Sequence, residues 1–437
     1  MKITSVVDMH CGAGWRDFSF LKIVTDTGIV GYSEFLEERN IGVTNVILWL
    51  GELIVGEDPL PYERITQRLR AITRHISGGI AAQAIAAIEN ALLDVVGKHL
   101  GVPVSSLFGG PVRDELPVYW SHAGSFRLQH AHHMGIPRPD VKPIRTLADV
   151  EAAGREVREG GFPALKTNIF MLESAQPEMY MPGFGGGEGG PELNLPFKLI
   201  DNLIDQLAAL RRGAGSDVGI KLDLNYNFKP EGVVQIGRVL VAARDVIGPI
   251  DWLEYDIPDR AAMRWIRQEV KIPIASLESL YGRAQYKPFL DDQAVDYAIV
   301  DVLWNGAWES LKIAALADTY HVNCAAHNYH GWLGTAISAH WCASIPNFKV
   351  LEIDVDDVPW KDEIVSVVPV VKDGKLKLPT GPGWGVNLNE DVIARHPAKR
   401  SVMTGIWSGP PRTLPSTVDE TREVDERSDN GKRQRQS

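Results

Sequence analysis

Ionisable side chains stand at the ends of short apolar runs in the central part of the chain. From about Leu116 onward, eight such runs alternate with longer stretches of helical periodicity. The residues at their ends are, in chain order, Ser121, Lys166, Asp223, Glu254, Glu278, Asp301, His327 and Glu352. Seven of these eight are ionisable, which is more than the ordinary polarity of loops explains. If the runs are parallel strands of one closed sheet, their carboxyl ends share one face and form a site.

Three carboxylates in this series predict a metal site. Asp223, Glu254 and Glu278 end three successive runs, and neighbouring strands lie about 4.8 Å apart. Like charges at that spacing repel unless a cation lies between them. Oxygen ligands with positions left for water suit Mg²⁺. The alternative is that each carboxylate is neutralised by a lysine or an arginine.

The next two strand ends favour proton transfer. Asp301 and His327 end the sixth and seventh runs. A carboxylate beside an imidazole selects its tautomer and raises its basicity, as a general base requires. Lys166 ends the second run and has two open interpretations. It is an acid/base group whose pKa is lowered by nearby cations, or it only neutralises the ring of carboxylates.

Three further residues are candidates for contacts with a substrate. Glu352 ends the eighth run and could hydrogen-bond to a substrate oxygen. Asn225 lies two residues past Asp223, so its amide points to the same face of the strand. Arg16, in a loop between the first strands, could reach an anionic substrate.

Eight strand–helix units within about 240 residues predict a closed α/β barrel of the TIM type rather than an open sheet. The runs 18–24 and 29–35 predict a hairpin, and helical spacing follows over 59–76 and 80–100. A second hairpin is expected over 370–378, where it would rejoin the N-terminal sheet. The domains are therefore an α+β cap (1–115, completed by about 356–395) and a barrel over 116–355.

Composition restricts the class of partner. The chain has 437 residues, with 45 basic and 56 acidic side chains, a net charge of −11 and a pI near 5.6. This balance argues against nucleic acid or an anionic membrane as the main partner. Three cysteines without a CxxC pair, and no signal peptide or long charge-free apolar run, favour a reducing cytoplasm.

Two segments differ in composition from the rest. Residues 396–437 contain few large apolar side chains and are expected to form a disordered tail. The insert at 176–191 is rich in glycine and follows the second strand of the barrel. It is either a mobile lid over the open face or a plain surface loop.

The stretch 87–98, with Gly101-Val102-Pro103 and Leu107-Phe108-Gly109-Gly110 after it, resembles the N-terminal signature of the mandelate racemase/muconate lactonizing enzyme branch of the enolase superfamily. The ordered strand-end residues strengthen the resemblance, which covers about 1–395. It implies a capping domain over a modified (β/α)7β barrel and Mg²⁺ at the three carboxylates. It also implies abstraction of a proton α to a carboxylate. We expect a homo-oligomer that acts on a small acid.

One departure from that branch selects among its reactions. The branch commonly carries Lys-x-Lys at the end of the second strand, and here Asn168 replaces the second lysine. Because an amide cannot exchange a proton at neutral pH, Asn168 is assigned to substrate binding and His327 to acid/base catalysis. The expected reaction is Mg²⁺-dependent dehydration of a sugar acid to a 2-keto-3-deoxy acid. The alternatives are a racemase or epimerase that uses Lys166 and His327 on opposite faces, and a non-catalytic acid-binding barrel.

Overall fold

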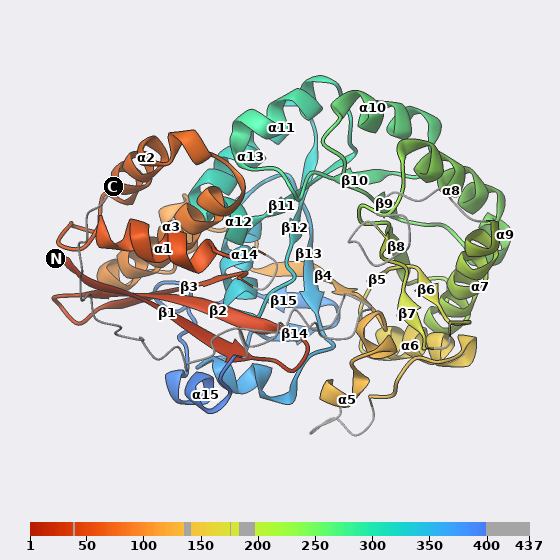
Figure 1. Cartoon of the computed structure of the whole chain (residues 1–437), viewed down its shortest axis with the longest axis horizontal. Coiled ribbons are helices and arrows are strands. Elements are labelled where there is room, and N and C mark those ends of the chain that lie inside the picture. Colours follow the sequence, from red (N-terminus) through yellow and green to blue (C-terminus); the bar gives the residue numbers. More distant parts are fainter. Residues whose placement is uncertain (38–39, 135–140, 175, 183–196, 399–437) are drawn as a thin grey trace, which may run out of the picture.

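A closed parallel barrel forms the larger part of the molecule, and a smaller α+β cap lies beside it (Figure 1). The computed structural model describes residues 1–37, 40–134, 141–174, 176–182 and 197–398. The barrel strands are β4 (Glu115–Ser121), β5 (Ala164–Thr167), β8 (Gly219–Asp223), β9 (Trp252–Glu254), β10 (Ile274–Ser276), β11 (Tyr297–Asp301), β12 (Asn323–His327) and β13 (Phe348–Asp354). Strand β13 pairs with β4 and closes the barrel. The eight predicted strands are confirmed.

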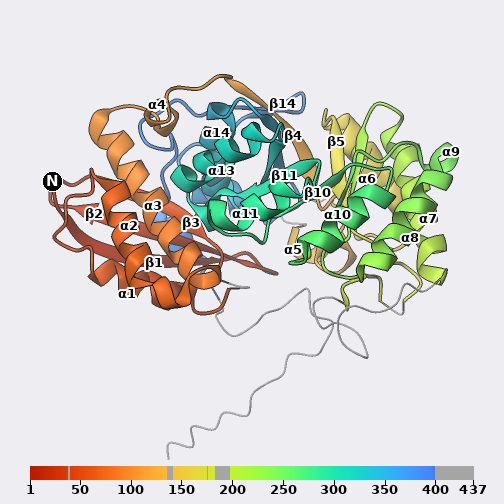
Figure 2. The same ribbon diagram turned by 90° about the horizontal axis from the view of Figure 1, so that it is seen from above.

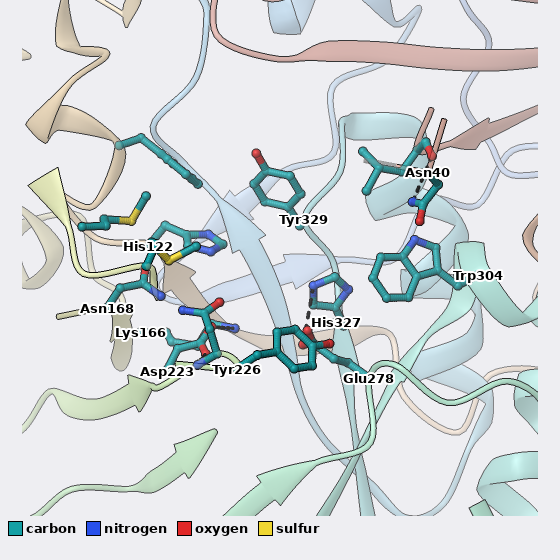
Figure 3. Close-up of a pocket in the computed structure, with 15 residues that line it drawn as sticks. Asn40, His122, Lys166, Asn168, Asp223, Tyr226, Glu278, Trp304, His327 and Tyr329 are labelled. Carbon is teal, nitrogen blue, oxygen red and sulfur yellow. Dashed lines mark hydrogen bonds and ion pairs between the residues drawn. The ribbon is translucent and has the colours of Figure 1, made fainter. Parts of the chain in front are cut away.

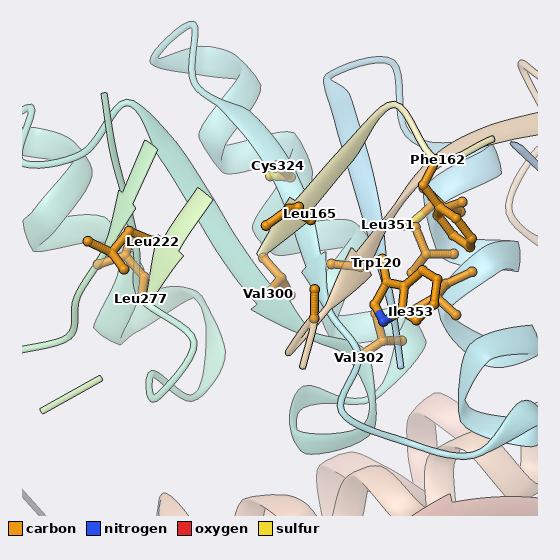
Figure 4. Packing of buried hydrophobic residues seen from close by; sticks show 14 of the residues in the cluster. Trp120, Phe162, Leu165, Leu222, Leu277, Val300, Val302, Cys324, Leu351 and Ile353 are labelled. Carbon is orange, nitrogen blue, oxygen red and sulfur yellow. The ribbon is translucent and has the colours of Figure 1, made fainter. Parts of the chain in front are cut away.

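Helices on the outside of the barrel connect successive strands. They are α6 (Leu147–Glu159), α7 (Phe197–Ala214), α8 (Pro230–Ala242), α10 (Arg260–Glu269), α11 (Gly282–Asp291), α13 (Ala307–Thr319) and α14 (Trp332–Ser344), with the short helices α5 (Ala131–Met134), α9 (Arg244–Ile247) and α12 (Val302–Asn305) between them. Apolar side chains from the outer faces of the strands fill the layer beneath these helices (Figure 4). The order of strands and helices is that of the predicted (β/α)7β barrel.

The cap combines an antiparallel sheet with helices. Its strands are β1 (Ile3–Gly12), β2 (Asp17–Thr25) and β3 (Val30–Phe35), and its helices are α1 (Val43–Glu52), α2 (Tyr62–Ile72) and α3 (Gly79–Leu100). Helix α3 is long and apolar enough to cross a membrane, but 83% of its apolar window is buried inside the protein. It ends before Gly101, whose left-handed φ of 70° is typical of a glycine C-cap.

The cap lies against one side of the barrel (Figure 2), and buried polar side chains connect the two. Glu34, at the end of β3, accepts hydrogen bonds from the backbone N–H of Gly331 (2.5 Å) and Gly334 (2.8 Å) at the start of α14. A carboxylate is favourable there because the first N–H groups of a helix have no partner within it. In α3, Asn90 accepts from the N–H of Ala307 (2.9 Å). These bonds position the cap over the barrel.

The C-terminal hairpin corrects one prediction. Strands β14 (Val371–Lys372) and β15 (Lys375–Lys377) pair as expected, but β15 then pairs with the start of β4 and not with the cap sheet. Leu376 is buried opposite Leu116, while the lysines on either side are exposed. The apolar–polar alternation predicts a strand with one buried face, but it carries no information about which sheet edge receives it.

After this hairpin the chain packs on the cap again. Helix α15 (Glu390–Arg395) contacts β1, and Glu390 accepts hydrogen bonds from Lys22 Nζ and Tyr32 Oη. The N–H of Gly12 then donates to the carbonyl of His396 (2.7 Å). The first residues of the predicted tail therefore pack on the body of the protein, and 399–437 lie outside the described residues.

Candidate active site

The period-two alternation of the strands explains how the strand-end residues meet. One buried cluster fills the inside of the barrel and comprises Tyr119, Ala164, Trp252, Ala275, Ile299, Ala325 and Val350. Two positions further along six of these seven strands stand Ser121, Lys166, Glu254, Asp301, His327 and Glu352. Side chains two residues apart in a strand point to the same side. These six side chains therefore form the next layer above that buried cluster, at the open face of the barrel.

Glu278 reaches the same face by a different route. It stands three residues past Ala275, and Leu277 between them has a left-handed φ of 93°. A non-glycine residue rarely adopts this backbone, and such positions cluster at functional sites. His122 (φ 48°) and Asn225 (φ 51°) share the left-handed region and also follow strand ends. The mouth of the barrel thus contains three strained positions.

Lys166 lies at the centre of the acidic residues. Its Nζ is 2.6 Å from Glu254 Oε1, 2.8 Å from Glu352 Oε1 and 3.4 Å from Asp223 Oδ2. Burial lowers the pKa of Lys166, but the surrounding carboxylates outweigh this effect and raise the pKa well above its usual value. Of the two interpretations of Lys166, this arrangement supports a fixed positive charge and not a proton acceptor.

The carboxylates carry more negative charge than Lys166 can balance. Asp223 and Glu254 are direct partners in the pairing of β8 with β9. Burial raises the pKa of Glu254 to about 7, and Asp223 and Glu352 add to the rise. Burial also raises the pKa of Glu278 well above its usual value. Oxygen ligands whose negative charges are costly because they are buried close together suit a divalent cation. The assignment of these three ligands stays a prediction.

Two histidines share one buried aspartate beside this set. His327 Nδ1 lies 2.7 Å from Asp301 Oδ2, and His330 Nε2 lies 2.9 Å from the same oxygen. The other oxygen of Asp301 accepts from the N–H of Leu303 (2.7 Å) and Trp304 (2.8 Å) at the start of α12. The hydrogen bonds and charges of His330 and His327 outweigh the effect of burial, so the pKa of Asp301 is lowered. The donor atoms lie close enough for a metal, but Asp301 Oδ2 already accepts two hydrogen bonds.

His327 faces the acidic residues with its second nitrogen. Its Nε2 lies 3.7 Å from Glu278 Oε2. Burial lowers the pKa of His327, but Glu278 and Asp301 more than reverse this effect and raise the pKa to about 10. An ionised Glu278 therefore strengthens the proton affinity of His327, together with Asp301. The sequence alone did not assign His330 to the site, because a histidine at this place could equally be structural.

Glu352 has no free oxygen in this arrangement. Its Oε1 accepts from Lys166 and from Ser121 Oγ, and its Oε2 accepts from the N–H of Asn328 (2.9 Å). Its pKa is lowered because Lys166 and His327 outweigh the effect of burial. The side chain is 0% exposed. Its contacts support a role in holding Lys166 rather than the predicted hydrogen bond to substrate.

A cavity of about 180 Å³ opens above these residues (Figure 3). Asn168 Oδ1, Asn225 Nδ2 and Trp304 Nε1 belong to residues that line it, and these buried atoms have no hydrogen-bond partner among the described residues. Leaving a buried polar group unpaired costs about 1–3 kcal/mol. One acceptor and two donors in a single cavity fit an oxygen-rich ligand. The predicted positions of Asn168 and Asn225 at the site agree with this geometry.

The cap and the glycine-rich insert also contribute to the cavity. Leu36 and Asn40 come from the cap, and Met179 and Met181 come from the insert. Met179 belongs to β7 (Glu178–Met179), which pairs with β6 (Phe170–Met171). The described part of the insert therefore covers the open face, and 183–191 lie outside the described residues.

Arg16 requires a correction. Its side chain is 4% exposed, and Nη1 lies 3.2 Å from Asp354 Oδ2 while Nη2 contacts Asp357. The guanidinium also lies 4.8 Å from the ring centre of Tyr329. It is not among the residues that line the cavity. Protein carboxylates already match its charge, so this structure gives Arg16 a role in holding Asp354 and not in binding substrate.

Several aromatic and imidazole side chains of the cavity were not found from the sequence. They are His122, Tyr226, Trp304 and Tyr329. Each lies within three residues of a predicted site residue: His122 follows Ser121, and Tyr329 lies two residues past His327. Proximity to a strand end was the available signal, but loop conformation decides which of these side chains turns inward.

Comparisons with known proteins agree with this architecture. The family model described as "Enolase C-terminal domain-like" matches residues 148–392, and "Mandelate racemase / muconate lactonizing enzyme, N-terminal domain" matches residues 9–109. A crystal structure of a proposed L-alanine-DL-glutamate epimerase from Burkholderia xenovorans strain LB400, bound to magnesium and fumarate, is 42% identical, with a TM-score of 0.86. That match covers 91% of this chain and 96% of the other.

Curated relatives are more distant in sequence. The D-xylonate dehydratase of Haloferax volcanii is 28% identical over 86% of this chain and 84% of its own length. A D-mannonate dehydratase of Caulobacter vibrioides is 27% identical over 89% and 93% of the two chains. The two family matches span the cap and the barrel together. The chain therefore belongs to the mandelate racemase/muconate lactonizing enzyme branch of the enolase superfamily.

Proposed function

We propose that the protein is a Mg²⁺-dependent dehydratase of a sugar acid. It would remove the proton α to the carboxylate and expel the β-hydroxyl, giving a 2-keto-3-deoxy acid. The observation that carries this proposal is the orientation of His327: Asp301 holds Nδ1 at 2.7 Å, and Nε2 is left facing Glu278. The names of the curated relatives, which are sugar-acid dehydratases, support the same reaction.

Asp223, Glu254 and Glu278 would hold the Mg²⁺ ion. When bound, the ion supplies charge stabilisation to the substrate carboxylate as that group gains a second negative charge. The donor set fits because Asp223 and Glu254 are buried, Glu278 is partly buried, and Lys166 balances only part of their negative charge. Lys166 remains protonated and adds a fixed positive charge close to the same region.

His327 would take the α-proton through Nε2. It must be neutral to do so, and the charge that most raises its pKa belongs to Glu278. A cation bound to Glu278 would compensate that charge and lower the pKa of His327 toward the working range of a general base. Asp301 keeps Nδ1 protonated because its carboxylate can only accept, so Nε2 is the basic nitrogen. Asn168, Asn225 and Trp304 offer hydrogen bonds to substrate oxygens.

A second candidate reaction is racemisation or epimerisation of a 2-substituted acid. It is favoured by the 42% identity to the proposed epimerase of Burkholderia xenovorans. This reaction needs proton-transfer groups on both faces of the α-carbon. Lys166 is held by three carboxylates, and Asn168 cannot carry a proton. These contacts favour dehydration.

A panel of aldonic and aldaric acids in D₂O with Mg²⁺ separates the candidates. Formation of a 2-keto acid, followed by semicarbazone absorbance, is the result expected of a dehydratase. Deuterium at the α-position with inverted configuration and no 2-keto product would replace this proposal with an epimerase. Binding by calorimetry, with neither exchange nor elimination, would indicate an acid-binding barrel.

A further inference from the structure

The cavity contains a second histidine held by a buried aspartate, and the reaction proposed above does not use it. His122 Nδ1 lies 2.9 Å from Asp354 Oδ1, and His122 lines the cavity. Asp354 is 2% exposed. Because a carboxylate can only accept, Nδ1 carries the proton and Nε2 is the nitrogen available to a ligand.

This pair repeats the arrangement around His327. In each case a buried aspartate at the end of a barrel strand binds Nδ1 of a cavity histidine. In each case the aspartate also accepts from a second nitrogen donor. His330 fills that place on Asp301, and Arg16 fills it on Asp354. The buried position of Arg16, which substrate binding does not explain, is accounted for in this way.

The orientation of His122 is enforced from several sides. Its backbone has a left-handed φ of 48°, which is uncommon for a side chain with a Cβ. Its ring lies 4.6 Å from that of Phe126 and 5.4 Å from that of Tyr329, measured between ring centres. In Figure 3 the rings of His122 and His327 enter the cavity from different sides. Retained strain and tight packing at a cavity wall are typical of a group with a functional task.

We infer that His122 is the general acid of the elimination, an assignment that rests on the proposed function. His327 Nε2 takes the α-proton, and the electron pair of that C–H bond goes to the α-carbon. That pair then forms the double bond between the α- and β-carbons as the bond from the β-carbon to its hydroxyl breaks. His122 enters the step as an imidazolium, with Nδ1–H held by Asp354, so the departing oxygen takes the proton from Nε2 and leaves as water. The resulting enol tautomerises to the 2-keto acid. Arg16 and Asp354 are positioning residues, since they act through His122.

Lys166 and the two amides of the cavity are less suited to this step. Lys166 lies within 2.8 Å of two carboxylate oxygens, which hold its proton. The amides of Asn168 and Asn225 do not release a proton. If His327 delivered its own proton to the leaving group, both reacting groups would have to lie on one face of the substrate. Two histidines on different sides of the cavity remove that constraint.

The decisive experiment compares two leaving groups in His122→Gln. The first substrate is the acid found in the panel, and the second is its 3-deoxy-3-fluoro analogue. Fluoride leaves with little need of a proton donor, whereas hydroxide does not. We expect kcat for dehydration to fall about 10²–10⁴-fold. Fluoride release and α-proton exchange in D₂O should stay near the wild-type rates. His99→Gln, an exposed histidine at the end of α3, is the matched control.

Fluoride release by the variant itself shows that its active site is folded. An equal loss with both substrates, or a higher KM with kcat unchanged, would overturn the assignment and make His122 a binding residue. Asp354→Asn should show the same selectivity for the hydroxyl substrate with a smaller loss, and an unselective loss there would contradict its positioning role. If His122→Gln dehydrates the acid at the wild-type rate, only the role of His122 is contradicted. If the wild-type protein dehydrates no acid in the panel, the proposed function is contradicted as well.

Discussion

Asp301 and His327 are direct neighbours across two paired barrel strands, and their side chains meet at 2.7 Å between Oδ2 and Nδ1. The register of β11 with β12 therefore sets the orientation of the imidazole. A loop could not hold the pair as firmly, because its backbone lacks the ladder of hydrogen bonds that positions both Cα atoms. The base proposed for this enzyme is thus built into the barrel itself.

Replacing His327 tests whether it takes the α-proton. His327→Asn should lower both dehydration and α-deuterium exchange at least about 10⁴-fold, because an amide cannot take up the α-proton. Asp301→Asn should be milder, since it disturbs the tautomer and leaves the imidazole in place. NMR in D₂O measures exchange directly. His321→Asn, at an exposed position with a left-handed φ of 58°, is the control. Exchange that persists in His327→Asn would assign the base elsewhere.

Metal binding should depend on pH in a defined direction. Burial raises the pKa of Glu254 from 4.5 to about 7, so the folded metal-free protein retains this proton up to near neutrality. A ligand must lose its proton before it binds a metal. Affinity for Mg²⁺ should therefore increase as the pH rises from about 5 to about 7, with proton release. Calorimetry in buffers of different ionisation enthalpy measures the released protons.

Glu254→Gln provides the corresponding variant. It should weaken Mg²⁺ binding and remove the pH dependence that Glu254 contributes, whereas Glu52→Gln on the surface of α1 should change neither. Chelation should abolish activity and added Mg²⁺ should restore it. Full turnover in excess chelator would contradict the metal assignment.

The variant Lys166→Met tests whether Lys166 is a fixed positive charge or the base that takes the α-proton. The raised pKa of Lys166 and its contacts with Glu254 and Glu352 predict that it stays protonated throughout. The variant should turn over slowly but continue to exchange the α-proton through His327. If exchange is lost in Lys166→Met and kept in His327→Asn, the two roles are reversed and Lys166 is the base.

The contact between cap and barrel should be sensitive to Glu34. Its carboxylate accepts two backbone N–H groups at the start of α14 and is 2% exposed. Glu34→Gln keeps the size but removes an acceptor and the charge that favours a helix N-terminus. The free energy of unfolding should fall by about 1–3 kcal/mol. Urea titration followed by tryptophan fluorescence measures this, with Glu52→Gln as a control expected within about 0.5 kcal/mol of wild type.

The amino-acid sequence by itself determined the elements and the identity of most strand-end residues. Apolar runs with a polar residue at the end predict strands whose last side chain is turned to one face, because alternation has a fixed period of two. The helix over 80–100 was equally predictable from its apolar spacing and its terminal glycine. These patterns lie within one segment of the chain, so they can be recognised without knowing which other segment packs against it.

Only the tertiary structure decided what each of these side chains contacts. The hairpin at 371–377 pairs with β4, Arg16 binds Asp354, and Glu352 holds Lys166. His122 enters the cavity through a left-handed backbone that no periodicity reveals. Closure of the barrel brings together residues more than two hundred positions apart, and the burial produced by that closure sets their charges. A local sequence pattern predicts neither which distant segments pair nor which charged groups become buried.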